Sequence, residues 1–164
     1  MIIDFNVKDL AAYLNDHLAG SVAAIELLDY LIKEQAGQRL EKFLVDLRDD
    51  VSADQQVLRD LIHKLGLEES VARKAGAWLM EKLGQAKIAV AGDERLGLLQ
   101  ALEALALGIT GKKLLWSALR TVEAGRPQLQ GLDLAALEGR AQEQFDRVEK
   151  ERLHLAREVF GRGD

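Results

Sequence analysis

The single proline of this 164-residue chain is the feature that most constrains its fold. Proline is excluded from helix interiors, because it has no backbone N–H to donate and its ring clashes with the preceding turn. Pro127 lies between Gly125 and Gly131, in a stretch that is typical of a loop. In the rest of the chain apolar residues recur at helical spacing, and no stretch of useful length alternates between apolar and polar residues. The sequence therefore predicts an all-α protein.

Five helices are expected from this periodicity. Their expected ranges are 7–35, 39–65, 68–89, 93–124 and 133–160. The second helix is expected to run unbroken through Ser52, because the apolar stripe keeps its register there even though Ser52 to Gln55 resembles a capping box. A helix of about 28 residues is about 40 Å long. Four long helices and one short helix predict a single domain over residues 1–164, an up-down four-helix bundle with an additional short helix in the crossover.

The fourth expected helix is apolar nearly all round. Only three polar side chains occur over residues 96–111, namely Gln100, Glu103 and Thr110. A helix of this kind is surrounded by other helices, and Gly97, Gly108 and Gly111 would let those neighbours approach closely. We therefore expect this helix to be central, or to place one apolar face in a homodimer interface. The short helix over 68–89 is expected to pack on its own bundle or on a second copy.

The composition excludes several classes of function. The chain has no cysteine, which excludes disulfides, thiolate metal sites and cysteine nucleophiles. The net charge is −5 and only 5% of the residues are aromatic, so no nucleic-acid partner is expected. The N-terminus has no basic stretch followed by a long apolar run, and no apolar run is long enough to span a membrane. A cytoplasmic protein without a membrane partner is the expectation.

Carboxylates and imidazoles occur along four of the expected helices in an order that suggests a metal site. The candidate ligands are Glu26, Asp60, His63, Glu103, Glu151 and His154. In two helices a carboxylate and a histidine are three residues apart, which puts both on one helix face. This arrangement resembles the ferritin-like superfamily, and the resemblance implies a carboxylate-bridged di-metal site inside the bundle, with iron or manganese bound.

The helix phase turns most of these candidates away from the apolar stripes. His63 lies about 150° from the centre of its stripe, and Glu26 and His154 lie about 130° from the centres of theirs. Asp60 also departs from the glutamate of the family pattern. We therefore expect a ferritin-like bundle without a complete di-metal site, with no cofactor and no catalytic residues. A divergent di-iron or di-manganese carboxylate protein, active as an oxidoreductase or in metal storage, is the alternative.

Four ionisable residues are expected on the inward faces of the helices. They are His17, Asp54, Glu103 and Lys113. Buried ionisable groups need partners, because an unpaired buried charge is strongly destabilising. These residues predict a buried polar cluster that either fixes the helix register or is the remnant of a ligand site.

The segment from His17 to Ser21 also resembles a histidine phosphotransfer motif. It departs from that motif because its glycine comes one residue early and no lysine precedes it. A phospho-accepting histidine must be exposed, whereas His17 is expected to face the bundle. The sequence thus favours a non-catalytic binding or structural interaction protein, with the metal–carboxylate protein and a phosphotransfer-like module as alternatives.

Overall fold

The computed structural model describes residues 6–70, 81, 84, 85, 88 and 94–161. The long helices are α1 (Val7–Glu34), α2 (Glu41–Lys64), α4 (Glu94–Thr121) and α5 (Leu134–Phe160), and no strand occurs within these described ranges. The all-α prediction is confirmed, and the four long helices begin and end within a few residues of the expected positions. The short helix expected over 68–89 falls mostly outside the described residues.

Local sequence signals fix the helix ends. The Asn6 side chain caps α1 by accepting a hydrogen bond from the Asp9 N–H at 3.2 Å, and the Asp133 side chain caps α5 in the same way. α2 runs unbroken through its capping-box sequence, as predicted. The loop that contains Pro127 joins α4 to α5. Gly125 and Gly131 both adopt positive φ in this loop, which glycine does without steric strain.

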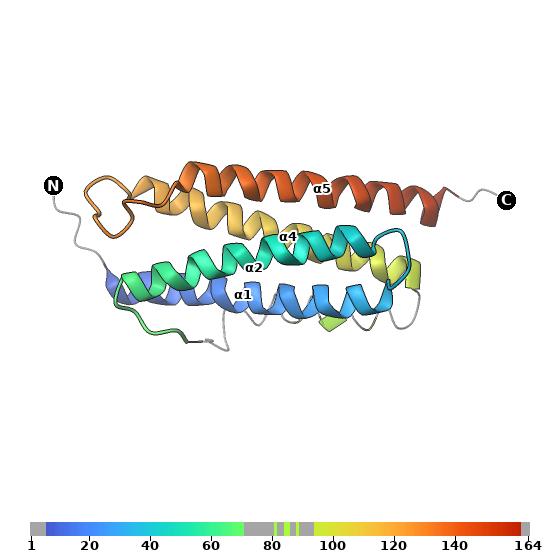
Figure 1. Cartoon of the computed structure of the whole chain (residues 1–164), viewed down its shortest axis with the longest axis horizontal. Helices are drawn as coiled ribbons and strands as arrows, with labels where there is room; N and C mark the ends of the chain where they lie inside the picture. The colour runs from blue at the N-terminus through green and yellow to red at the C-terminus, as the bar shows by residue number, and fades with distance from the viewer. Residues whose placement is uncertain (1–5, 71–80, 82–83, 86–87, 89–93, 162–164) are drawn as a thin grey trace.

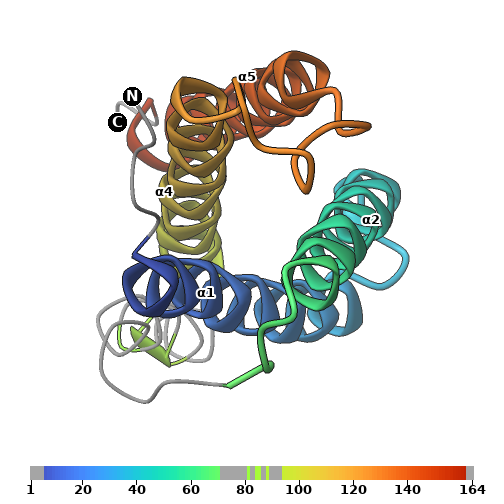
Figure 2. The same ribbon diagram turned by 90° about the vertical axis from the view of Figure 1, so that its left-hand side faces the viewer.

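The helices form two antiparallel hairpins, α1 with α2 and α4 with α5 (Figure 1). α2 and α4 run in the same direction, so α2 ends and α4 begins at opposite ends of the bundle. Residues 65–93 make this connection. In the end-on view the four helices surround a common centre, with α1 flanked by α2 and α4, and α5 flanked by α4 and α2 (Figure 2). The architecture is therefore a four-helix bundle with one long connection.

The bundle interior is built mainly from leucine side chains on all four helices, with Trp116 as its largest fully buried side chain. The helices of each hairpin pack closely along their length, and α4 also packs on α1. The expected central position of α4 is only partly confirmed, because Leu107 and Leu114 on one of its faces are more than half exposed. The homodimer interface stays a prediction. None of the helices in the described part of the chain is long and apolar enough to cross a membrane.

Candidate functional site

The candidate metal ligands on the first two helices point away from the bundle centre. Glu26 is exposed, and Asp60 is exposed and accepts a hydrogen bond from the Gln56 side chain at 2.8 Å. His63 is 62% exposed and lies 3.4 Å from a carboxylate oxygen of Glu69. These positions agree with the helix phase derived from the sequence.

The remaining metal candidates are each paired at the surface. Glu151 forms an ion pair with Arg39 at 2.6 Å, and half-exposed His154 lies 3.1 Å from Glu158. Within the described ranges, no three histidine, aspartate or glutamate side chains lie close enough together to share a metal ion. The residues present therefore do not fit the di-metal centre that the ferritin-like resemblance implies.

Glu103 corrects the expectation of a buried carboxylate on α4. Its side chain is 52% exposed and lies 3.4 Å from Arg152 of α5. It shares an exposed face of α4 with Leu107 and Leu114. The apolar character of α4 predicted cover on every side, but this face meets solvent. Glu103 therefore takes no part in a buried cluster.

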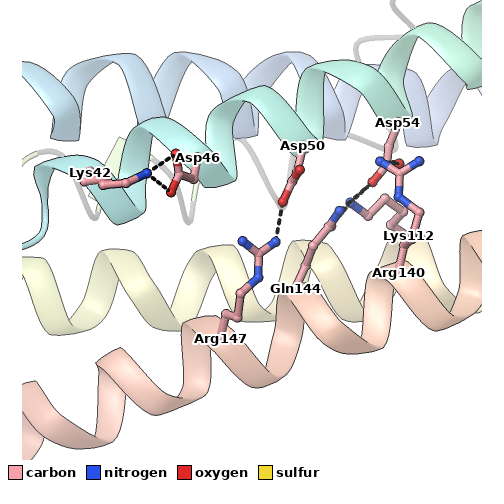
Figure 3. A network of polar contacts seen from close by, with 8 residues as sticks. All are labelled: Lys42, Asp46, Asp50, Asp54, Lys112, Arg140, Gln144 and Arg147. Atoms are coloured by element: carbon pink, nitrogen blue, oxygen red, sulfur yellow. Dashed lines mark hydrogen bonds and ion pairs between the residues drawn. The ribbon is translucent and has the colours of Figure 1, made fainter.

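Asp54 is the buried carboxylate that the sequence predicted, with a side chain only 3% exposed. Lys112 of α4 donates a hydrogen bond to Asp54 Oδ2 at 2.6 Å, and Gln144 of α5 donates to the same oxygen at 2.9 Å (Figure 3). Arg140 of α5 places Nη2 3.1 Å from Asp54 Oδ1. Lys112 also donates to the side-chain oxygen of Gln144. Three helices therefore meet in one buried polar network.

This network is not the predicted cluster of four residues. Lys113 is turned away from Asp54 and donates to Gln142 at 2.7 Å. The lysine that pairs with Asp54 is its neighbour Lys112, because a shift of one residue rotates a side chain by about 100° around the helix. His17 and Asp54 both line a cavity, without a hydrogen bond between them among the described contacts.

The network compensates the positive charge of the buried Lys112 ammonium only in part. Burial lowers the pKa of the Lys112 ammonium below its ordinary value, and the attraction of Asp54 opposes that effect without overcoming it. Arg140 adds a second positive charge and lowers the pKa of Lys112 further. One buried carboxylate thus faces two cations.

A cavity of about 340 Å³ lies between α1, α2 and α4, beside this network. Most of its described lining is apolar. The main polar and charged side chains on its walls are Asp16, His17, Ser21, Asp54, Gln55 and Lys112. Small-molecule sites in proteins are concave, mostly apolar and about 300 to 1,000 Å³ in volume, with a few convergent polar groups. The cavity has these properties.

Two glycines in the middle of α4 keep this cavity open. A Cβ atom added at Gly108 or Gly111 would meet no other atom of the described residues within 4 Å, and neither glycine adopts positive φ. The expectation that these glycines allow close helix packing is therefore wrong, because the space beside them is open. Each glycine in a helix interior is less favourable than alanine by about 1 kcal/mol. Neither backbone conformation nor helix packing accounts for them, whereas both line the cavity.

His17 forms part of the α1 wall of the cavity. The His17 ring packs edge-on against the Tyr13 ring, with the ring centroids 4.8 Å apart. Burial lowers the pKa of His17 below its ordinary value, although the adjacent Asp16 carboxylate acts in the opposite direction. The imidazole is therefore neutral at neutral pH, and it has no hydrogen bond to any residue that the structure describes. A partly buried neutral ring is unsuited to the exposed phosphate-accepting role of the phosphotransfer alternative.

Sequence reasoning missed two central members of the network, Lys112 and Gln144. The signal for Gln144 was present, because it lies three residues after Ala141 and four before Val148, on the buried stripe of α5. Lys112 lies three residues after the buried Ile109 on α4. Polar residues on an apolar stripe are therefore the signal that locates this network.

Comparison of the chain with protein-family models, with curated protein sequences and with solved structures gives no match. No site residue is therefore assigned by similarity to a relative. The chemistry of the site follows from an apolar cavity, a neutral imidazole on one wall and a buried ion pair on another. These groups can hold a small molecule and orient it by hydrogen bonds.

Proposed function

We propose that this chain is a non-catalytic, ferritin-like helical bundle that binds a small, mostly apolar molecule in the cavity between α1, α2 and α4. The observation that carries the proposal is the pair of helix-interior glycines, Gly108 and Gly111, beside open space. Glycine at both positions lowers the stability of α4, and the missing side chains enlarge the cavity. A requirement for space to bind a ligand accounts for both effects.

The helix order supports the ferritin-like part of the proposal. Two antiparallel hairpins with one long connection between them are the arrangement of ferritin-like bundles. The proposal includes no di-metal centre. The buried carboxylate of Asp54 already forms an ion pair with Lys112, which neutralises its charge. The iron or manganese alternative would need its candidate ligands to converge, and they lie on separate surface patches.

Binding of 1-octanol, measured by isothermal titration calorimetry, tests the proposal. We expect the wild-type protein to bind one octanol molecule per chain, with a negative heat-capacity change from apolar burial. Gly108→Leu should abolish binding, because the new side chain would fill the cavity. Gly139→Leu is the matched control, since Gly139 is an exposed residue within α5 that also has open space around it and does not line the cavity.

The two variants make the test decisive. Both should keep the helical circular dichroism and the cooperative unfolding of the wild-type protein. Octanol binding that is lost only in Gly108→Leu would support the cavity as the site. Equal binding by wild type and Gly108→Leu, or no binding by the folded wild type, would overturn the proposal.

A further inference from the structure

We infer that the ligand of this cavity is an apolar amine, whose single ammonium group pairs with the Asp16 carboxylate on the α1 wall. The inference rests on the proposed function and adds the chemistry of the ligand head group. It depends on the charges that line the cavity, on hydrogen-bond acceptors that have no donor, and on the aromatic ring near Asp16.

The charges on the walls of the cavity leave one carboxylate uncompensated. The charged side chains in its described lining are Asp16, Asp54 and Lys112, with one negative charge in excess. Asp54 and Lys112 form an ion pair at 2.6 Å, which leaves the charge of Asp16. Arg140 also contacts Asp54, but its side chain is 43% exposed and does not line the cavity, so water screens its charge. The excess negative charge favours a cationic head group.

Asp16 is available to a ligand. It is half-buried on the α1 wall, and no hydrogen bond or ion pair joins it to any residue that the structure describes. Its negative charge acts on the neighbouring His17, because it raises the pKa of that imidazole against the larger effect of burial. A carboxylate that is partly removed from water is stabilised by a cation at hydrogen-bond distance. An ammonium group in the cavity would supply that cation.

The cavity walls also carry hydrogen-bond acceptors that lack a donor. Asp54 Oδ1 is buried and accepts no hydrogen bond from the described residues, although Arg140 Nη2 lies 3.1 Å away. The neutral His17 ring has one nitrogen that can only accept, and none of the described residues donates to it. An ammonium group has three N–H donors and no acceptor. A carboxylate head group, which only accepts, would leave these atoms without a donor and would be repelled by Asp16.

The surroundings of Asp16 suit an organic cation with an apolar body. Tyr13, Asp16 and His17 are spaced at i, i+3 and i+4, so they share one face of α1. The Tyr13 ring therefore lies within one helical turn of the carboxylate, and an aromatic ring attracts an ammonium group near its face. The remaining walls, which include Leu58 and Leu105, would surround the hydrocarbon chain of the amine.

Octylamine and 1-octanol separate this inference from the proposed function, because they share a chain length and differ in the head group. Octylamine is protonated at pH 7, like a lysine side chain. We expect the wild-type protein to bind octylammonium about fivefold more tightly than octanol by titration calorimetry, and to bind octanoate more weakly than octanol. The preference for octylammonium should shrink in 1 M salt, since Asp16 is only half-buried.

Asp16→Asn and Glu26→Gln are a matched pair of variants. Each removes one carboxylate charge from α1, but Glu26 is exposed and does not line the cavity. The preference for octylammonium over octanol should be lost in Asp16→Asn and kept in Glu26→Gln, and both variants should bind octanol as the wild-type protein does. Neither side chain has a hydrogen bond or ion pair with the described residues, so both variants are expected to fold.

His17 supplies a second measurement. Its pKa, followed by NMR of the imidazole ring protons, should fall further when the protein is saturated with octylammonium than with octanol, because a cation at Asp16 opposes protonation of the ring. An equal change with both probes would contradict the placement of the ammonium at Asp16. Octanol binding without a preference for octylammonium, or a preference that survives in Asp16→Asn, would overturn the amine inference and leave the proposed function in place. Failure of both probes to bind the folded wild-type protein would overturn the proposed function as well.

Discussion

The cavity between α1, α2 and α4 differs in construction from the contact between α2 and α5. We call the latter the α2–α5 seam, defined by the ion pairs of Asp50 with Arg147 and of Asp54 with Arg140. Charged side chains reach across the seam (Figure 3). The cavity, by contrast, has mostly apolar walls and two glycines. Ion pairs fix the register of two helices, because their partners must be in place. The comparison indicates that the ion pairs of the α2–α5 seam specify the alignment of the helices, whereas the glycines beside the cavity lower the stability of the bundle.

The largest effect is expected from Asp54→Ala at the junction of the two regions. Its removal leaves Lys112 buried beside Arg140 without a carboxylate, and the free energy of unfolding should fall by about 3 kcal/mol. Urea unfolding followed by circular dichroism measures this loss. In Asp54→Leu/Lys112→Met most of the stability should return, since Arg140, the cation that is left without its partner, is 43% exposed and no buried charge remains unpaired. Equal losses in both variants would show that the ion pair does not determine the effect.

A smaller effect of opposite sign is expected from Gly108→Ala and Gly111→Ala. Each should raise the free energy of unfolding by about 0.5 to 1 kcal/mol, because alanine favours the helix and its methyl group meets no described atom at these positions. The same measurement on Gly139→Ala should give a similar gain. Octanol affinity should fall in the two α4 variants and be unchanged in the control. A loss of stability at Gly108 would mean that the space beside it is already filled.

The seam away from Asp54 should respond weakly. Arg147→Ala breaks the ion pair with Asp50, in which both side chains are 37% exposed, and should lower the free energy of unfolding by at most about 1 kcal/mol. The loss should shrink in 1 M salt, since salt screens exposed charges. Arg120→Ala, which breaks a pair with Glu138 inside the α4–α5 hairpin, is the control. A much larger loss of unfolding free energy in Arg147→Ala, without a similar loss in Arg120→Ala, would show that the Asp50–Arg147 ion pair contributes to stability as much as Asp54 does.

The smallest effect is expected from the pH dependence of His17, which is only half-buried. Because burial lowers its pKa in the folded state, the unfolded chain binds this proton more tightly. The contribution of neutral His17 to the free energy of unfolding is therefore fully present above the pKa of about 6.5 in the unfolded chain. It is lost as the pH falls through the lower pKa of the folded state. Urea midpoints at several pH values should decline less toward acid in His17→Gln than in wild type. Identical declines would show that His17 has no part in the pH dependence.

Periodicity and capping residues were sufficient to predict the four long helices. The same reasoning identified Asp54 as buried and turned His63 and His154 outward, in agreement with the structure. It failed for Glu103, because a run of apolar residues does not show which face of a helix lacks a neighbour. The cavity could not be predicted, since it depends on how three separate helices are spaced around two glycines.

The single long connection between the hairpins has a consequence for the order of folding. Contacts inside each hairpin join residues that are close in the sequence, whereas Gln144 meets Asp54 across 90 positions. Closing so long a loop loses more chain entropy than closing a hairpin does, and contacts between distant residues form slowly. We expect the hairpins to form first and to dock afterwards. The Asp54 network, which joins one hairpin to the other, then exists only in the docked bundle, so amide hydrogen exchange should report the assembly of the site as a step later than helix formation.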